Sequence, residues 1–113
     1  MTPQAFARCA LALPAATHQV QWGDDQVYKV GGKMFAVTDG AASVLSLKVS
    51  DIAFEALVES GRARTAPYLA RAKWVRFDDL AALDDDEVAG WLRNAHALVA
   101  AKLTRKARRE LGL

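Results

Sequence analysis

The side chains best suited to chemistry in this sequence are cations that gather near one end of the chain. They are Lys102, Arg105, Lys106, Arg108 and Arg109. Several cations on adjacent helical turns can contact successive phosphates and release the counterions that a polyanion holds. The same charges also suit the negative end of a helix dipole and keep a helix soluble. A nucleic-acid interface and a solvated helix are both consistent with this cluster.

A second basic block lies between residues 62 and 76, where the sequence has no acid. Its candidate contact residues are Arg64, Arg71 and Lys73, and they flank the aromatic residues Tyr68 and Trp74. Bases stack on aromatic rings beside cations in proteins that bind single-stranded nucleic acid. Aromatic side chains of a small domain more often belong to its core, so both interpretations stay open.

A third group consists of polar and aromatic residues that two neighbouring strands would bring to one end of a sheet. It contains His18, Trp22, Asp24 and Tyr28, which are the residues to examine if an enzyme site is built without a local motif. Together with Trp74, the residues His18, Trp22 and Tyr28 are candidates for a ligand-binding aromatic face.

No enzyme active site is recognisable, because the sequence lacks a G-x-S-x-G elbow, a Walker loop and an H-E-x-x-H motif. Cys9, His18 and His96 are the only soft metal ligands, and their spacing is not that of a zinc site. We expect Cys9 to be a small buried apolar residue and His96 to be partly buried with one hydrogen bond. The acidic run 84–87 is explained by a helix start, with Asp84 as N-cap. The sequence predicts no enzyme, no metal and no cofactor.

Composition predicts one soluble domain over residues 1–113. Hydrophobic residues make up 52% and charged residues 25%, which is typical of a globular protein and not of a disordered or membrane chain. The single cysteine excludes an internal disulfide, and no signal peptide is visible, so we expect a cytoplasmic protein. Residues 1–61 carry four cations against six acids, and residues 62–113 carry eleven against seven, so the second half is the basic one.

Periodicity and turn residues predict an α+β two-layer sandwich, in which helices from both ends of the chain pack on an antiparallel sheet. We expect helices from Pro3 towards Pro14 and over 51–60, and strands over 18–22, 27–30, 33–38, 44–49 and 73–77. Gly31 and Gly32 predict a tight hairpin. A long last helix should start after Asp84, bury Trp91 in the core and continue through Leu103 into the basic cluster.

Several short segments together resemble the MmcQ/YjbR family of small bacterial proteins. They are Leu13-Pro14, Trp22-Gly23, 29–33 (KVGGK), Lys73-Trp74, and Leu98-Val99 followed by Lys102-Leu103. The resemblance implies a CyaY-like α+β fold and a DNA-binding role. The sequence differs from the family pattern at His96, where tyrosine is frequent, and at Thr104, where proline is frequent.

The function predicted from the sequence is weak nucleic-acid binding or regulation, largely independent of base sequence, through the basic cluster. The alternative is a module that binds a protein or a small ligand through the aromatic face of the sheet.

Overall fold

The chain folds into an antiparallel sheet with helices, as described for residues 1–67 and 69–113 in a computed structural model. The elements are α1 (Pro3–Leu11), β1 (Ala16–Gln21), β2 (Asp25–Val30), β3 (Lys33–Thr38), β4 (Leu45–Lys48), α2 (Asp51–Glu59), β5 (Arg64–Thr65), η1 (Ala70–Ala72), β6 (Trp74–Phe77), η2 (Leu80–Ala82), α3 (Asp85–Ala100) and α4 (Arg105–Glu110). The sheet has six strands in the order β1-β2-β3-β4-β6-β5, so β1 to β4 form the predicted meander. The α+β class is confirmed.

The start of each longer helix is determined by a capping side chain. Thr2, Ser50 and Asp84 each accept a hydrogen bond from the backbone N–H three residues later, which satisfies one of the free donors at the helix start. The predicted hairpin between β2 and β3 is also confirmed, because both of its glycines have positive φ angles. These local signals could be identified from the sequence because each one acts within a few residues.

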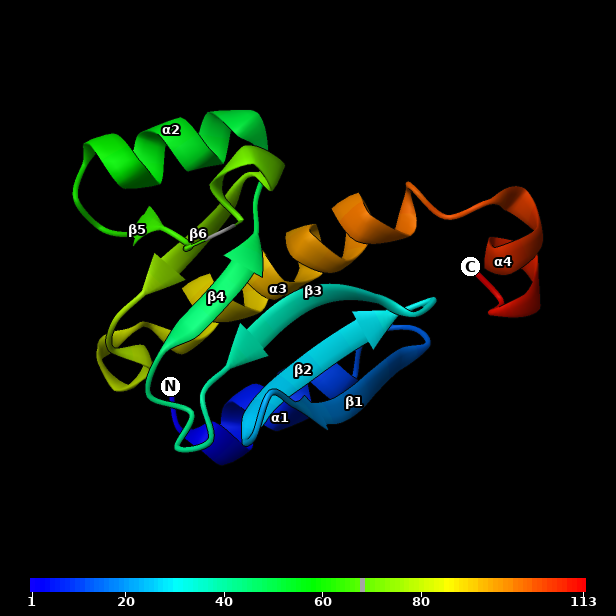
Figure 1. The fold of residues 1–113 in the computed structure, drawn as a ribbon, viewed down its shortest axis with the longest axis horizontal. Helices are drawn as coiled ribbons and strands as arrows, with labels where there is room; N and C mark the ends of the chain where they lie inside the picture. Colours follow the sequence, from blue (N-terminus) through cyan, green and yellow to red (C-terminus); the bar gives the residue numbers. More distant parts are fainter. Residues whose placement is uncertain (68) are drawn as a thin grey trace.

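Helices α1 and α3 cover the same face of the sheet, and α2 lies beside β5 and β6 (Figure 1). The core lies between α3 and the central strands, and it includes Leu45, Leu47, Phe77, Leu92 and Val88. The ring of Phe6 on α1 meets Tyr28 edge-on, with the ring centroids 5.4 Å apart. One face of α3, the longest helix, therefore packs against the sheet, and its other face does not contact the sheet.

The sequence predicted that His18, Val20 and Trp22 alternate onto one face of the first strand, and this is wrong at the end of the strand. His18 pairs with Tyr28 in β1–β2 register, on the face that meets α1. Trp22 instead follows the strand in a turn with a φ angle of +50° and lines a groove with Val37. The turn rotates Trp22 out of the alternating pattern, so His18 and Trp22 do not share a face. Strand β1 is an edge strand, with Val20 51% exposed rather than half-buried in a core.

The predicted continuous C-terminal helix is also wrong. Helix α3 ends at Ala100, and a separate helix, α4, begins after Thr104. Leu103 turns inward at this break and packs beside Gly31 of the β2–β3 hairpin. Helical periodicity alone does not reveal the break, because Leu103 continues the apolar spacing of α3 while its side chain contacts a different part of the sheet.

Single substitutions of the two hairpin glycines should separate backbone strain from packing. A Cβ at position 31 would lie 2.7 Å from Leu103 Cδ1, whereas one at position 32 would meet open space. We expect Gly32→Ala to lower the free energy of unfolding by about 1 kcal/mol through its positive φ angle. Gly31→Ala should cost about 2 kcal/mol because Leu103 must also move. Urea denaturation measures both, and equal losses would show that Leu103 can move away from the new Cβ without a cost in stability.

Candidate functional site

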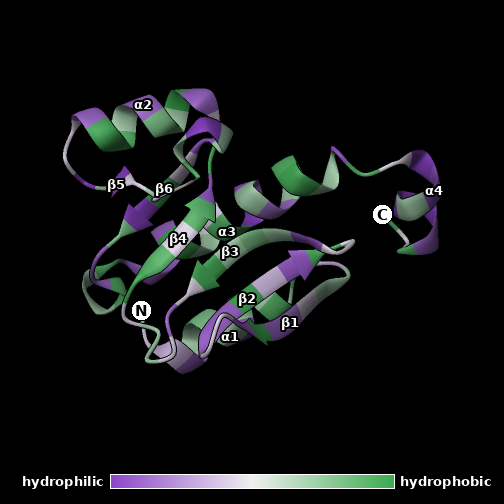
Figure 2. Cartoon of the chain, viewed as in Figure 1, coloured by the Kyte–Doolittle hydropathy of each residue, from purple (hydrophilic) through white to green (hydrophobic). Residues whose placement is uncertain are grey.

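The four cations of α4 lie on one half of its surface. They are Arg105, Lys106, Arg108 and Arg109, and all four are exposed. At about 100° per residue they span an arc of roughly 160°, with Ala107 on the opposite side. Ala107 is partly buried against the core, so the cationic half faces away from the body of the protein. In Figure 2, α4 is mostly coloured as hydrophilic and stands at the end of the molecule.

Three arginines of α4 converge on one hollow. Arg105, Arg108 and Arg109 line it together with Leu113, and its volume is about 400 Å³. A guanidinium presents its N–H groups in a planar fork that matches the oxygens of a phosphate. An anionic group in this hollow would lie within reach of more than one arginine.

Lys48, which sequence reasoning missed, is a further cation whose charge interacts with those of Lys73 and Lys102. Burial lowers the pKa of Lys48, the charges of Lys102 and Lys73 lower it further, and Asp51 opposes them. The Lys48 ammonium donates a hydrogen bond to the carbonyl of Ala72, the residue before Lys73, so these two lysines lie close together. No local pattern in the sequence indicates that Lys48 lies near the other lysines, because these residues are far apart in the chain.

The second basic block is largely neutralised by acids. Arg64 Nη2 and Arg76 Nε both donate to Asp78 Oδ1, at 2.8 Å and 3.0 Å. The hydrogen bond from Arg64, followed by that from Arg76, holds the pKa of Asp78 below its ordinary value. Arg64, predicted to bind nucleic acid, therefore has an acidic partner that the sequence did not show.

Arg62 has a partner of its own in Glu87. Its two terminal nitrogens contact the two carboxylate oxygens of Glu87 at 2.8 Å and 3.0 Å, and this bidentate contact lowers the pKa of Glu87. Arg71 is exposed, and Lys73 lies with its ammonium 4.8 Å from the ring centroid of Phe54. The predicted stacking residue Tyr68 lies outside the described residues.

The structure does not bring the predicted aromatic residues to one surface. Tyr28 is 4% exposed and Trp74 is 5% exposed, so both belong to the interior. Burial raises the pKa of the Tyr28 hydroxyl. His18 Nε2 lies 2.6 Å from Gln26 Oε1, and Gln26 in turn donates to the carbonyl of Asp24. These polar residues form a hydrogen-bonded chain along the β1–β2 hairpin.

The remaining candidates have structural roles. The His96 Nε2 lies 2.7 Å from the carbonyl oxygen of Pro14, which confirms the expected hydrogen bond, and at 7% exposed the ring is more deeply buried than predicted. Cys9 is partly buried beside the core. Asp84 accepts from the Glu87 N–H, as a cap should. Among residues 1–67 and 69–113, no three His, Cys, Asp or Glu side chains converge as metal ligands. Nor does any helix in these ranges have the length and apolar character needed to cross a membrane.

These features define a class: small α+β proteins whose antiparallel sheet carries helices on one face, here with an exposed basic helix. The family model of YjbR matches residues 11–98, and the chain belongs to the YjbR family. The chain is similar to the crystal structure of Deinococcus radiodurans protein DR2400, a DUF419 domain. The TM-score is 0.86 and the identity 26%, over 99% of this chain and 88% of that one. No curated protein matches.

The family assignment confirms the resemblance seen in the sequence. The match to the family model ends at residue 98, before Lys102 and the cations of α4. The family name therefore says nothing about the basic cluster, and any function for the cluster must be argued from its own geometry.

Thr104→Ala tests how the basic helix is held. The Thr104 Oγ1 accepts from the Ala107 N–H, and α4 is too short to be stable without support. We expect the variant to reduce the local stability of α4 by about 1 kcal/mol while the unfolding midpoint of the whole protein changes little. Amide hydrogen exchange of residues 107–111 measures the local effect. Unchanged exchange there would contradict the capping role.

Proposed function

We propose that this protein binds nucleic acid weakly and with little dependence on base sequence. The contact residues are Lys102, Arg105, Lys106, Arg108 and Arg109, with Lys48 and Lys73 at the edge of the same surface. The observation that carries the proposal is that none of these cations takes part in an ion pair among the described residues. Within residues 1–67 and 69–113, the ion pairs involve the chain's first amino group, Arg62, Arg64 and Arg76, and none involves α4.

Unpaired cations support polyanion binding because their charge is not already offset. Arg64 would have to leave Asp78 before it could contact a phosphate, whereas Arg105 need not leave any ion pair. The hollow beside Leu113 adds a place where several guanidinium groups can meet one phosphate. Contacts of this kind position a protein on the backbone but do not read the bases. We therefore expect a dissociation constant of roughly 10⁻⁴ to 10⁻⁶ M at physiological salt.

The proposed role is binding rather than catalysis, with cytoplasmic DNA or RNA as the partner. We do not propose the aromatic face of the sheet as the site of a protein or ligand, since Tyr28 and Trp74 are buried. Arg64 is omitted from the interface because of its pairing with Asp78. Arg71 is exposed and stays a secondary candidate.

The salt dependence of binding tests the proposal directly. With four or five phosphate contacts, the wild-type protein should bind a labelled duplex with a log–log salt slope near −4. The variant Arg105→Gln, Arg108→Gln, Arg109→Gln removes three contacts and should flatten the slope by roughly 3. Fluorescence anisotropy between about 20 and 200 mM salt measures the slope, and duplexes of different base sequence should bind alike.

A second triple variant controls for net charge. Arg8, Arg64 and Arg93 are also exposed arginines, but they lie on α1, β5 and α3. Replacing these three with glutamine removes the same charge and should leave the slope unchanged within about 0.5. An equal effect of both triple variants would mean that net charge, not the α4 surface, drives binding. Failure of the wild-type protein to bind at about 20 mM salt would overturn the proposal.

A further inference from the structure

Strand β1 forms one edge of the sheet, with no strand on its outer side among the described residues (Figure 1). It pairs with β2 in a continuous antiparallel register that runs from Ala16 opposite Val30 to Gln21 opposite Asp25. Apart from this ladder, residues 17–21 make no backbone hydrogen bond within residues 1–67 and 69–113. Only alternate residues of a strand bond to one neighbour, so the other N–H and C=O groups of β1 point away from the sheet. These groups form a template on which a further strand can pair.

The sequence of β1 lacks the features that protect sheet edges from other chains. The strand Ala16–Gln21 contains no Lys, Arg, Asp, Glu or Pro, and its pairing with β2 has no bulge. Its four middle residues are exposed. Three large apolar side chains on or next to the strand are exposed as well: Leu11 at the end of α1, Val20, and Trp22 in the turn. The opposite edge, β5, has only two residues, and one of them is the ion-paired Arg64.

The hairpin of β1 and β2 carries opposite charges towards its two ends. Asp24 and Asp25 lie at the turn, whereas Lys29 on β2 and Lys33 at the start of β3 lie towards the other end. The Lys29 ammonium reaches over β1, where it donates to Gln19 Oε1 at 3.0 Å. In an antiparallel pair of two β1 strands, the acidic end of each copy meets the basic end of the other. The charges therefore favour a second copy of this chain over a strand of unrelated sequence.

We propose that two copies of this chain associate through β1, in an antiparallel pair around a two-fold axis. Side chains directly opposite in such a pair lie on the same face, so the axis passes through one residue position. An axis at Gln19 places Thr17 opposite Gln21 of the second copy and His18 opposite Val20 of the second copy. Such an interface is small, so the association is weak and depends on protein concentration. It is separate from α4 and does not depend on nucleic-acid binding.

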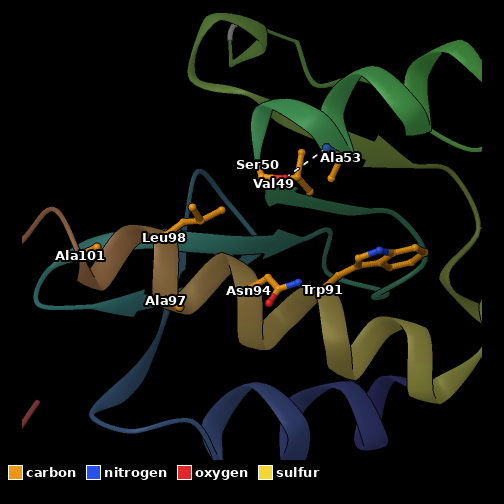
Figure 3. Close-up of a pocket in the computed structure, with 8 residues that line it drawn as sticks. All are labelled: Val49, Ser50, Ala53, Trp91, Asn94, Ala97, Leu98 and Ala101. Carbon is orange, nitrogen blue, oxygen red and sulfur yellow. Dashed lines mark hydrogen bonds between the residues drawn. The ribbon is translucent and has the colours of Figure 1, made fainter.

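A cleft between α2 and α3 is the alternative apolar surface on which two copies could meet (Figure 3). Its volume is about 340 Å³, and its lining includes Ala53 and Leu98. Trp91, predicted as a core residue, is only partly buried: its ring stacks on Phe77 with the centroids 4.5 Å apart, and it also borders the cleft. Ile52 precedes Ala53 on α2 and is 83% exposed. It is therefore a matched control for an exposed apolar residue of β1, at the other end of the sheet.

Sedimentation equilibrium, with protein up to about 1 mM in about 50 mM salt, tests the proposal. The average mass of the wild-type protein should rise with concentration from that of one chain towards that of two. Val20→Lys puts a charge on the edge and should weaken association at least about tenfold. Ile52→Lys makes a similar change on α2 and should leave association within about twofold. A wild-type protein that stays monomeric, or equal effects of the two variants, would overturn the proposal.

Reversal of the end charges tests the antiparallel arrangement. Asp24→Lys with Asp25→Lys makes both ends of the hairpin basic, and Lys29→Glu with Lys33→Glu makes both ends acidic. Each double variant alone should associate about three- to tenfold more weakly than the wild type, whereas a mixture of the two should form a mixed dimer. The β1 amides that point away from β2 should exchange more slowly in the mixture than in either variant alone. A mixture that associates no better than its components would contradict the proposed pairing.

Discussion

The packing of α3 against the sheet determines where the other functional groups lie. Val88, Leu92, Ala95 and Val99 are buried on this helix, and each buried valine or leucine contributes about 1.5–3 kcal/mol relative to an exposed one. This seam fixes the rotation of α3, so Trp91, Asn94 and Leu98 line a cleft beside the start of α2. It also fixes the end of the helix, where Lys102 comes near Lys48. The positions of the cleft and of the lysines near the end of α3 therefore both depend on the packing of α3 against the sheet.

The distribution of ion pairs divides the basic half of the chain into two parts. Around β5 and β6, Arg62, Arg64 and Arg76 contact Glu87 or Asp78, so their charges are offset locally. Exposed pairs of this kind add little to stability, yet they reduce the charge available to a distant anion. The cations of α4 share their helix with Glu110, but none of them forms an ion pair within residues 1–67 and 69–113. In the sequence both blocks are clusters of Lys and Arg. Only the fold shows that the block around β5 and β6 is paired with acids.

Local features of this fold could be predicted from the sequence, whereas features that depend on distant contacts could not. The caps at Thr2, Ser50 and Asp84 and the glycine hairpin each act within a few residues, and all are confirmed. The break before Thr104 was missed because Leu103 fits the α3 period but packs beside Gly31. The cleft and the Lys48 cluster were missed for the same reason, since each joins elements far apart in the chain.

The composition of α4 makes its stability sensitive to anions. Arg105 has like charges three and four positions away, at Arg108 and Arg109, and such pairs destabilise a helix by about 0.2–0.5 kcal/mol each. A helix of six residues has little intrinsic stability to offset this repulsion. Its support comes from the Thr104 cap and from the partly buried Ala107. A bound polyanion would screen the repulsion, so the contacts that bind phosphate would also order the helix that presents them.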